Sequence, residues 1–121
     1  MIKTIIIDDE RLARQELKSL LKDFSDIEII AEFGNADEAI EGLKNLEPEL
    51  IFLDIQMPVM NGLEVLDELT STGEINDIYI IALTAYSLNA ERSDILSAGA
   101  KGILTKPLSK VFSTDQVETF N

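Results

Sequence analysis

One stretch, from Glu49 to Gly62, restricts the possible folds more than any other part of the chain. It contains the unbroken apolar run Leu50–Leu53, which is typical of a strand covered on both faces, and the run stops at Asp54. Such strands belong to parallel α/β sheets, in which ligands bind outside the carboxyl ends of the strands. Pro58 and Asn61-Gly62 predict a turn directly afterwards. Asp54 therefore has the position of a nucleophile or metal ligand, although by itself it fits a solvated strand end equally well.

Four further apolar runs predict strands, and helical patterns separate them. Besides the run before Asp54, the predicted strands are Thr4–Ile7, Ile27–Phe33, Ile78–Leu83 and Gly102–Leu104. The predicted helices are Arg11–Asp23, residues 35 to 46, Leu63–Leu69, Leu88–Ala98 and a last one after Pro107.

Local signals mark several helix boundaries. Asp8 or Asp9 is expected to cap the first helix, Asn35 followed by Glu38 resembles a capping box, and Gly99 predicts the end of the fourth helix. The apolar residues of the first helical segment are predicted to belong to the core: Leu12, Ala13, Leu17, Leu20, Leu21 and Phe24.

Strands that alternate with helices of this length predict βαβ units and a parallel sheet with right-handed crossovers. The expected fold is a flavodoxin-like, doubly wound α/β sandwich with five strands in the order 2-1-3-4-5 and about five flanking helices. Residues 1 to 121 are expected to form a single domain. The glycine patterns of dinucleotide and nucleoside triphosphate sites are absent from the sequence.

Composition excludes several kinds of chemistry. The chain has no Cys and no His, so disulfides, thiol nucleophiles and histidine catalysis are excluded. Ten Lys and Arg against 23 Asp and Glu give a net charge of −13, which disfavours direct binding to nucleic acid or anionic membranes. There is no signal peptide pattern and no long apolar run, so a cytoplasmic location is expected.

Polar and charged residues follow four of the five predicted strands. These residues are Asp8-Asp9, Asp54, Thr84 and Lys106, and in the expected strand order they gather at one edge of the sheet. Clustered carboxylates repel one another unless a cation is present, and oxygen ligands match a hard ion such as Mg²⁺. Three aspartates balanced by Mg²⁺ and one lysine suit the transfer of a phosphoryl group to Asp54.

Each of these residues also has an ordinary explanation. Lys106 could be a solvated lysine, Thr84 a simple strand-end hydroxyl, and Asp8-Asp9 a helix cap. Their joint occurrence at four strand ends favours the functional interpretation.

Together, these residues identify a family. From Ile2 to Leu108 the chain resembles the receiver (REC) domain of bacterial two-component response regulators. The motifs are Ile6-Ile7-Asp8-Asp9-Glu10, Leu53-Asp54-Ile55-Gln56-Met57-Pro58 with Asn61-Gly62-Leu63-Glu64, Leu83-Thr84-Ala85 and Leu104-Thr105-Lys106-Pro107. The first half is similar to receivers that precede LytTR-type DNA-binding domains, and the second half to receivers of hybrid kinases.

The resemblance implies a metal-dependent phosphoacceptor site. It makes Asp54 the phosphorylated residue and Asp9 a direct ligand of Mg²⁺ or Mn²⁺. It also implies that Asp8 holds the metal through water and that the backbone carbonyl of Gln56 completes the ligands. Pro58 and Gly62 are implied to shape the following loop.

The resemblance also implies how the phosphoryl group is held and sensed. Thr84 would hydrogen-bond the group and Lys106 would pair with it, with a cis peptide before Pro107. Receivers commonly carry Tyr or Phe where this chain has Ile103, so Ile103 and Tyr86 are expected to modify the switching of the face formed by helix four, strand five and helix five.

The implied partners are a sensor histidine kinase or a histidine phosphotransfer protein, and a downstream effector of unknown kind. A phosphorylation-dependent homodimer is a further expectation. No turnover of an external substrate is expected. The alternatives are a pseudo-receiver that binds partners without phosphorylation and a haloacid-dehalogenase-type phosphatase, which would need an Asp where this chain has Gln56.

Overall fold

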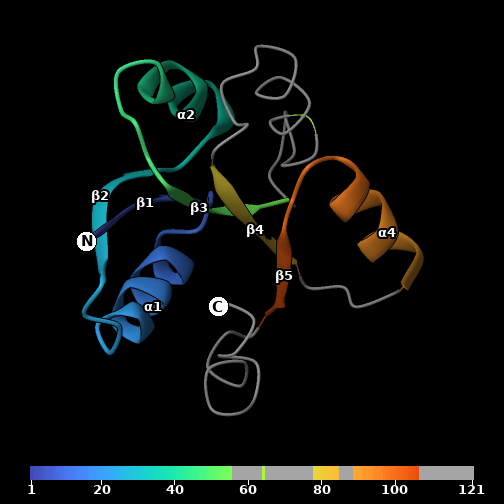
Figure 1. Cartoon of the computed structure of the whole chain (residues 1–121), viewed down its shortest axis with the longest axis horizontal. Helices are drawn as coiled ribbons and strands as arrows, with labels where there is room; N and C mark the ends of the chain where they lie inside the picture. The colour runs from blue at the N-terminus through green and yellow to red at the C-terminus, as the bar shows by residue number, and fades with distance from the viewer. Residues whose placement is uncertain (56–63, 65–77, 85–88, 107–121) are drawn as a thin grey trace.

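A computed structural model describes residues 1–55, 64, 78–84 and 89–106 of the chain (Figure 1). The elements in chain order are β1 (Ile2–Ile7), α1 (Arg11–Leu21), β2 (Ile27–Phe33), α2 (Ala36–Leu43), β3 (Leu50–Asp54), β4 (Tyr79–Thr84), α4 (Asn89–Ser97) and β5 (Gly102–Thr105). Of the helix predicted over Leu63–Leu69 only Glu64 is described, and the predicted last helix lies outside the described residues.

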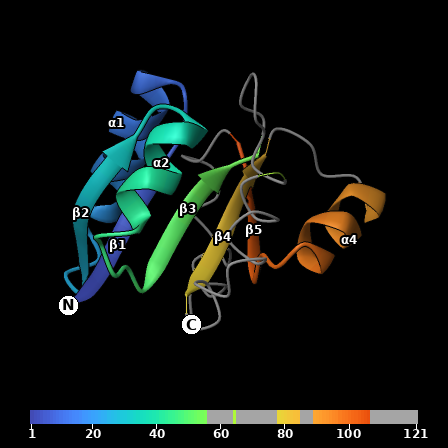
Figure 2. The same ribbon diagram turned by 90° about the horizontal axis from the view of Figure 1, so that it is seen from above.

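The five strands form one parallel sheet in the order β2-β1-β3-β4-β5, as predicted (Figure 2). The register places Ile7 of β1 beside Leu53 of β3, and Asp54 beside Leu83 of β4. The carboxyl ends of β1, β3 and β4 therefore lie next to one another at one edge of the sheet.

Alternate side chains of the strands enter two separate apolar layers. Ile5 and Ile7 of β1 pack with α2, whereas Ile6 between them packs with Leu17 and Leu21 of α1. The α2 layer also contains Ile95 of α4, so α2 and α4 cover one face of the sheet and α1 covers the other (Figure 1).

The central strand β3 is covered on both faces, which explains its unbroken apolar run. Ile51 and Leu53 belong to the α2 and α4 layer, and Leu50 and Phe52 belong to the α1 layer. All of β3 is buried, including Asp54 at its end. The prediction of a doubly covered strand is confirmed.

Several strand and helix boundaries differ from the predicted ones. Asp54 and Thr84 are the last residues of their strands rather than the residues that follow, because both still take part in the ladders of the parallel sheet. β1 begins at Ile2, where it already pairs with Ile27. Helix α2 ends at Leu43, three residues early, where the hydrogen bonds tighten to the i−3 type at Lys44.

The cap of α1 was predicted wrongly. Glu10 is the N-cap, it has an extended backbone, and its side chain makes no capping hydrogen bond. Asp8 Oδ1 accepts a hydrogen bond from Glu10 N at 2.9 Å, but this bond orders the turn before the helix. Helix α1 also ends at Leu21, two residues before the predicted Asp23.

The other two boundary signals are confirmed. Asn35 Oδ1 accepts a hydrogen bond from Glu38 N at 2.9 Å at the start of α2. Gly99 has φ 124°, its N–H donates to Leu96 O, and the next N–H, of Ala100, donates to Ile95 O. This pair of bonds is a Schellman motif, which ends α4 at a position where glycine has no steric cost.

Leu12 is a further correction, because it was predicted to be in the core and is 72% exposed. It precedes Leu17 by five residues, which places it about 140° around the helix from the buried side chain. Ala13, four residues before Leu17, lies on the packed side and is partly buried. The helices in the described part of the chain fall short of the requirements of a membrane span, since none of them has the length and apolar character to cross a bilayer.

Candidate functional site

Four residues of the predicted site occupy one edge of the sheet. Asp8 follows β1, Asp54 ends β3, Thr84 ends β4 and Lys106 follows β5. The backbone N–H of Lys106 donates to Thr84 O at 2.8 Å, so the lysine begins beside the end of β4. Asp8, Asp54 and Thr84 are buried, with 1%, 2% and 1% of their surface exposed.

Four carboxylates come together at this edge. Asp8, Asp9, Glu10 and Asp54 each offer an oxygen atom, and these atoms all lie within 4.8 Å of one another. Asp8 and Asp54 are buried, while Asp9 and Glu10 are exposed to solvent. The sequence interpretation did not assign Glu10 a role at the site, although the acidic run after β1 already contained the signal.

Lys106 is the cation of this cluster. Its Nζ lies 3.0 Å from Asp8 Oδ2, 3.6 Å from Glu10 Oε1 and 3.7 Å from Asp54 Oδ2. Burial by itself lowers the pKa of Lys106, but the hydrogen bond to Asp8 and the charges of Asp54, Asp8 and Glu10 outweigh burial, and its pKa is raised. Lys106 is therefore charged at neutral pH, and it lies beside the carboxylates at this edge of the sheet. Its predicted role in holding a phosphoryl group stays a prediction.

Asp8 is held at each of its polar groups. Its N–H donates to Phe33 O at 3.0 Å, and its carbonyl oxygen accepts a hydrogen bond from Arg14 Nη1 at 2.6 Å. Its two carboxylate oxygens accept hydrogen bonds from Glu10 N and Lys106 Nζ. This anchoring fixes the position from which Asp9 and Glu10 extend into solvent.

Ile103 lies in the core rather than at the acidic edge. It is 9% exposed, pairs with Ala82 in the sheet, and belongs to the same apolar layer as Ile95 of α4. A β-branched side chain in such a layer has few rotamers available.

The remaining predicted site residues are Gln56, Pro58, Gly62, Tyr86 and Pro107, and all of them lie outside the described residues. Their roles, and the cis peptide before Pro107, stay predictions.

The donor set at this edge fits a hard divalent cation. Every donor in the cluster is a carboxylate oxygen, and oxygen ligands are those that Mg²⁺ and Mn²⁺ prefer. Among the residues that the structure describes, one ammonium faces four carboxylates, so this group carries an excess of negative charge. The site can therefore accept a cation without a further counter-charge.

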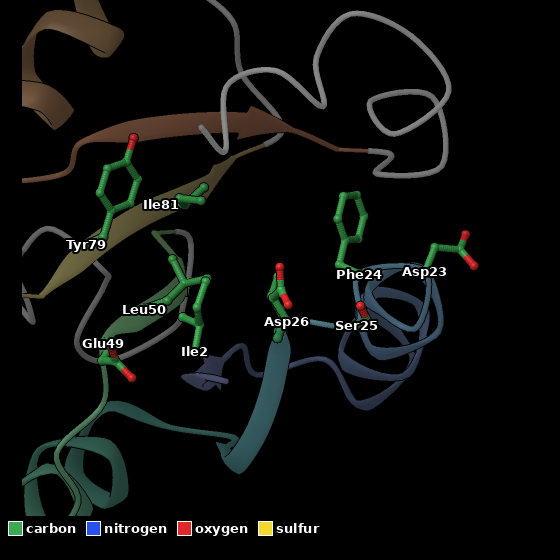
Figure 3. Close-up of a pocket in the computed structure, with 10 residues that line it drawn as sticks. Ile2, Asp23, Phe24, Ser25, Asp26, Glu49, Leu50, Tyr79 and Ile81 are labelled. Carbon is green, nitrogen blue, oxygen red and sulfur yellow. The ribbon is translucent and has the colours of Figure 1, made fainter.

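A cavity of about 530 Å³ lies at the opposite edge of the sheet, where the strands begin (Figure 3). None of the predicted site residues that the structure describes lines it. Its lining consists of Ile2, Asp23, Phe24, Ser25, Asp26, Ile27, Glu49, Leu50, Tyr79 and Ile81. The candidate chemistry is therefore concentrated at the carboxyl edge, as expected for a doubly wound sheet.

A doubly wound sheet with an acidic carboxyl edge and a lysine after its fifth strand defines the class of receiver domains. The family model of the response regulator receiver domain matches residues 4–117, and the chain belongs to this family.

Curated relatives agree with this assignment. The chain is 40% identical over 110 residues to the transcriptional regulatory protein BtsR of Salmonella typhi, a match that covers 91% of this chain and 46% of that protein. It is 38% identical over 109 residues to the transcriptional regulatory protein LnrK of Bacillus subtilis strain 168, covering 90% and 49%. The chain thus spans about half the length of these relatives.

Solved structures show the same fold. The response regulator domain of Thermotoga maritima CheB superposes with a TM-score of 0.82 at 26% identity, covering 99% of this chain and 91% of that one. The isolated REC domain of RcsB from Salmonella enterica serovar Typhimurium, determined with the phosphomimetic BeF3-, gives a TM-score of 0.79 at 22% identity, with 96% and 88% covered. The predicted likeness to receivers that precede LytTR-type domains stays a prediction.

Proposed function

We propose that this receiver domain accepts a phosphoryl group on Asp54 in a reaction that requires a divalent cation. The observation that carries the proposal is the placement of Asp54, a buried carboxylate at a strand end, with Lys106 Nζ 3.7 Å from its Oδ2 and three other carboxylates beside it. Structural carboxylates are rarely gathered in this way, because their mutual repulsion opposes folding.

Asp9, Asp54 and the backbone carbonyl of Gln56 would hold Mg²⁺ or Mn²⁺, with Asp8 acting through a bound water molecule. Glu10 is a further oxygen donor at the same place. When bound, the cation supplies charge compensation for the carboxylates and for the phosphoryl oxygens.

The chain has no His, so the phosphoryl group must come from elsewhere. The donor we propose is a phosphohistidine on a sensor histidine kinase or a histidine phosphotransfer protein. An oxygen of Asp54 attacks phosphorus, the P–N bond breaks, the imidazole leaves with the electron pair, and an acyl phosphate forms on Asp54. Lys106 pairs with the transferred oxygens and Thr84 donates its hydroxyl hydrogen bond to one of them.

The output of the domain is proposed to be a change in the face that contains α4 and β5. A downstream effector or a second copy of the domain would read this change. The relatives named as transcriptional regulators are about twice as long, so an output in transcription would require parts of a protein beyond this domain. We expect no turnover of an external substrate.

Incubation with Mg²⁺ and acetyl phosphate, followed by intact mass measurement, tests the proposal. The wild type should gain one phosphoryl group, Asp54→Asn should gain none, and the exposed-carboxylate control Asp94→Asn should behave as the wild type. A wild type that gains no mass would favour the pseudo-receiver alternative, and release of phosphate from a generic phosphomonoester would favour the phosphatase.

A further inference from the structure

Arg14 of α1 joins the acidic loop to the edge strand of the sheet. Its Nη1 donates to the carbonyl oxygen of Asp8 at 2.6 Å, and its Nε donates to Glu32 Oε1 of β2 at 2.8 Å. The guanidinium group is mostly buried, with 15% of the Arg14 side chain exposed. One planar group thus holds two segments in a fixed relation.

The contact with Asp8 controls the residue that follows. The carbonyl of Asp8 belongs to the peptide unit that it shares with the N–H of Asp9, and this unit is planar. A hydrogen bond to that carbonyl therefore fixes the plane from which Asp9 starts. The N–H of Asp8 is already fixed by Phe33 O, so Arg14 supplies the second restraint on the backbone at this point.

Glu32 is what holds Arg14 in place. Its carboxylate accepts hydrogen bonds from Arg14 on one oxygen and from Lys18 Nζ, at 2.5 Å, on the other. Lys18 and Arg14 both bind the Glu32 carboxylate. Within the described residues, however, only Arg14 also donates a hydrogen bond to the Asp8 carbonyl. The two cations therefore form a natural comparison.

We propose that Arg14 is a positioning residue for divalent-cation binding, held by Glu32 and acting on Asp9 through the Asp8 carbonyl. This inference rests on the proposed function, because it assumes that Asp9 is a metal ligand. Residues that orient metal ligands from outside the coordination shell typically change metal affinity by about tenfold or more when they are replaced.

A purely electrostatic effect of Arg14 would change Mg²⁺ affinity in the opposite direction, so the two explanations can be distinguished. Arg14 carries a positive charge near a site for a cation, so removing that charge alone should strengthen cation binding. Positioning predicts that the same replacement weakens it.

The test is a Mg²⁺ titration of the full chain without any phosphoryl donor, followed by amide chemical shifts and by calorimetry. Arg14→Met keeps an apolar stem and removes both hydrogen bonds, and it should weaken Mg²⁺ binding about tenfold. Lys18→Met removes the other cation from Glu32 and should bind Mg²⁺ at least as tightly as the wild type. Arg14→Lys keeps the positive charge but loses the planar set of guanidinium N–H donors, so its Mg²⁺ affinity should fall between those of Arg14→Met and the wild type.

Glu32→Gln is the second route to the same conclusion should Arg14→Met not fold. It leaves Arg14 present but less firmly held, so it should weaken Mg²⁺ binding and broaden the Asp9 amide signal. Equal or tighter binding in Arg14→Met, or in Glu32→Gln where Arg14→Met does not fold, overturns the positioning role. A wild type that binds no Mg²⁺ overturns the proposed function itself, so the two failures are distinguishable.

Discussion

Lys106 Nζ lies 3.0 Å from Asp8 Oδ2 and 3.7 Å from Asp54 Oδ2, so in this structure the lysine is hydrogen-bonded to the neighbouring acid rather than to the proposed phosphoacceptor. The pair joins residues 98 positions apart in the sequence. A small movement of the long Lys106 side chain would take its ammonium from Asp8 to a phosphoryl group on Asp54.

Replacement of this lysine is expected to destabilise the protein without metal. Lys106→Met leaves Asp8 and Asp54 buried without their cation, and loss of one partner of a buried pair costs about 3 kcal/mol in unfolding free energy. Urea denaturation in the presence of a chelator measures the change. The matched control is Lys44→Met, whose exposed pair with Glu41 should contribute less than about 0.5 kcal/mol. Equal effects of the two replacements would contradict the role given to Lys106.

Magnesium is expected to raise the melting temperature, because a cation that binds only the folded state stabilises it. At a concentration 100 times the dissociation constant the gain is about 2.7 kcal/mol. Thermal melts with and without millimolar Mg²⁺ measure this gain. Asp9→Asn should remove most of it, and Asp94→Asn should not. A wild-type melting temperature that is indifferent to Mg²⁺ would count against the cation site.

Glu32 is expected to make stability depend on acid pH. Hydrogen bonds from Lys18 and then from Arg14 lower the pKa of Glu32. A lowered folded-state pKa contributes stability that is present above the pKa of an unfolded glutamate, about 4.3, and is lost as the pH falls through the folded-state value. The measurement is the unfolding free energy of wild type and Glu32→Gln between neutral pH and pH 3.

The difference in unfolding free energy between wild type and Glu32→Gln should shrink steadily as the pH falls below the pKa of an unfolded glutamate. Glu41→Gln is the control, because its pair with Lys44 is exposed, and it should follow the wild-type profile. A difference between wild type and Glu32→Gln that does not change with pH would show that the ion pairs of Glu32 add nothing.

Gly42 is expected to be irreplaceable at the contact between α2 and β2. A methyl group added there would overlap the ring of Phe33. Alanine normally favours a helix by about 1 kcal/mol over glycine, but the overlap should reverse the sign and destabilise the fold by about 1–3 kcal/mol. Gly102→Ala is the comparison, because its nearest neighbour would lie at an ordinary 3.6 Å.

The double variant Gly42→Ala with Phe33→Leu should recover part of the lost stability, which a double-mutant cycle in urea would measure. Simple additivity of the two replacements would mean that the Phe33 ring is not the obstacle.

Signal transmission is expected to involve α4 rather than the rotamer of Ile103. Among the side chains of residues 93–97 only Ile95 is buried, so this described part of the helix places one side chain in the core. Addition of beryllofluoride with Mg²⁺ should shift the amide signals of Asn89–Ser97, with little change in the methyl signals of Ile103. Thr84→Ala should keep the changes around Asp54 and lose those in α4. Changes confined to residues that touch Asp54 in the wild type would mean that no signal reaches the helix.

The sequence alone determined the strands, their alternation with helices and the edge at which the acids meet. Unbroken β-branched and aliphatic runs such as Ile5–Ile7 and Leu50–Leu53 suit only strands covered on both faces, and a parallel sheet places all their carboxyl ends together. Asn35 and Gly99 also marked helix ends correctly, because capping depends on neighbours within a few residues.

Only the tertiary structure decided which charged groups meet and which apolar residues stay exposed. The sheet register brings Lys106 to Asp8, and the rotation of α1 about its axis brings Arg14 to Asp8 and Glu32. A local sequence pattern contains neither the register nor the rotation. The same rotation buries the side of α1 that carries Leu17 and leaves Leu12, about 140° away around the helix, exposed to solvent. Long-range pairing depends on the sum of many contacts across the sheet, whereas a sequence pattern records only the local preference of each segment.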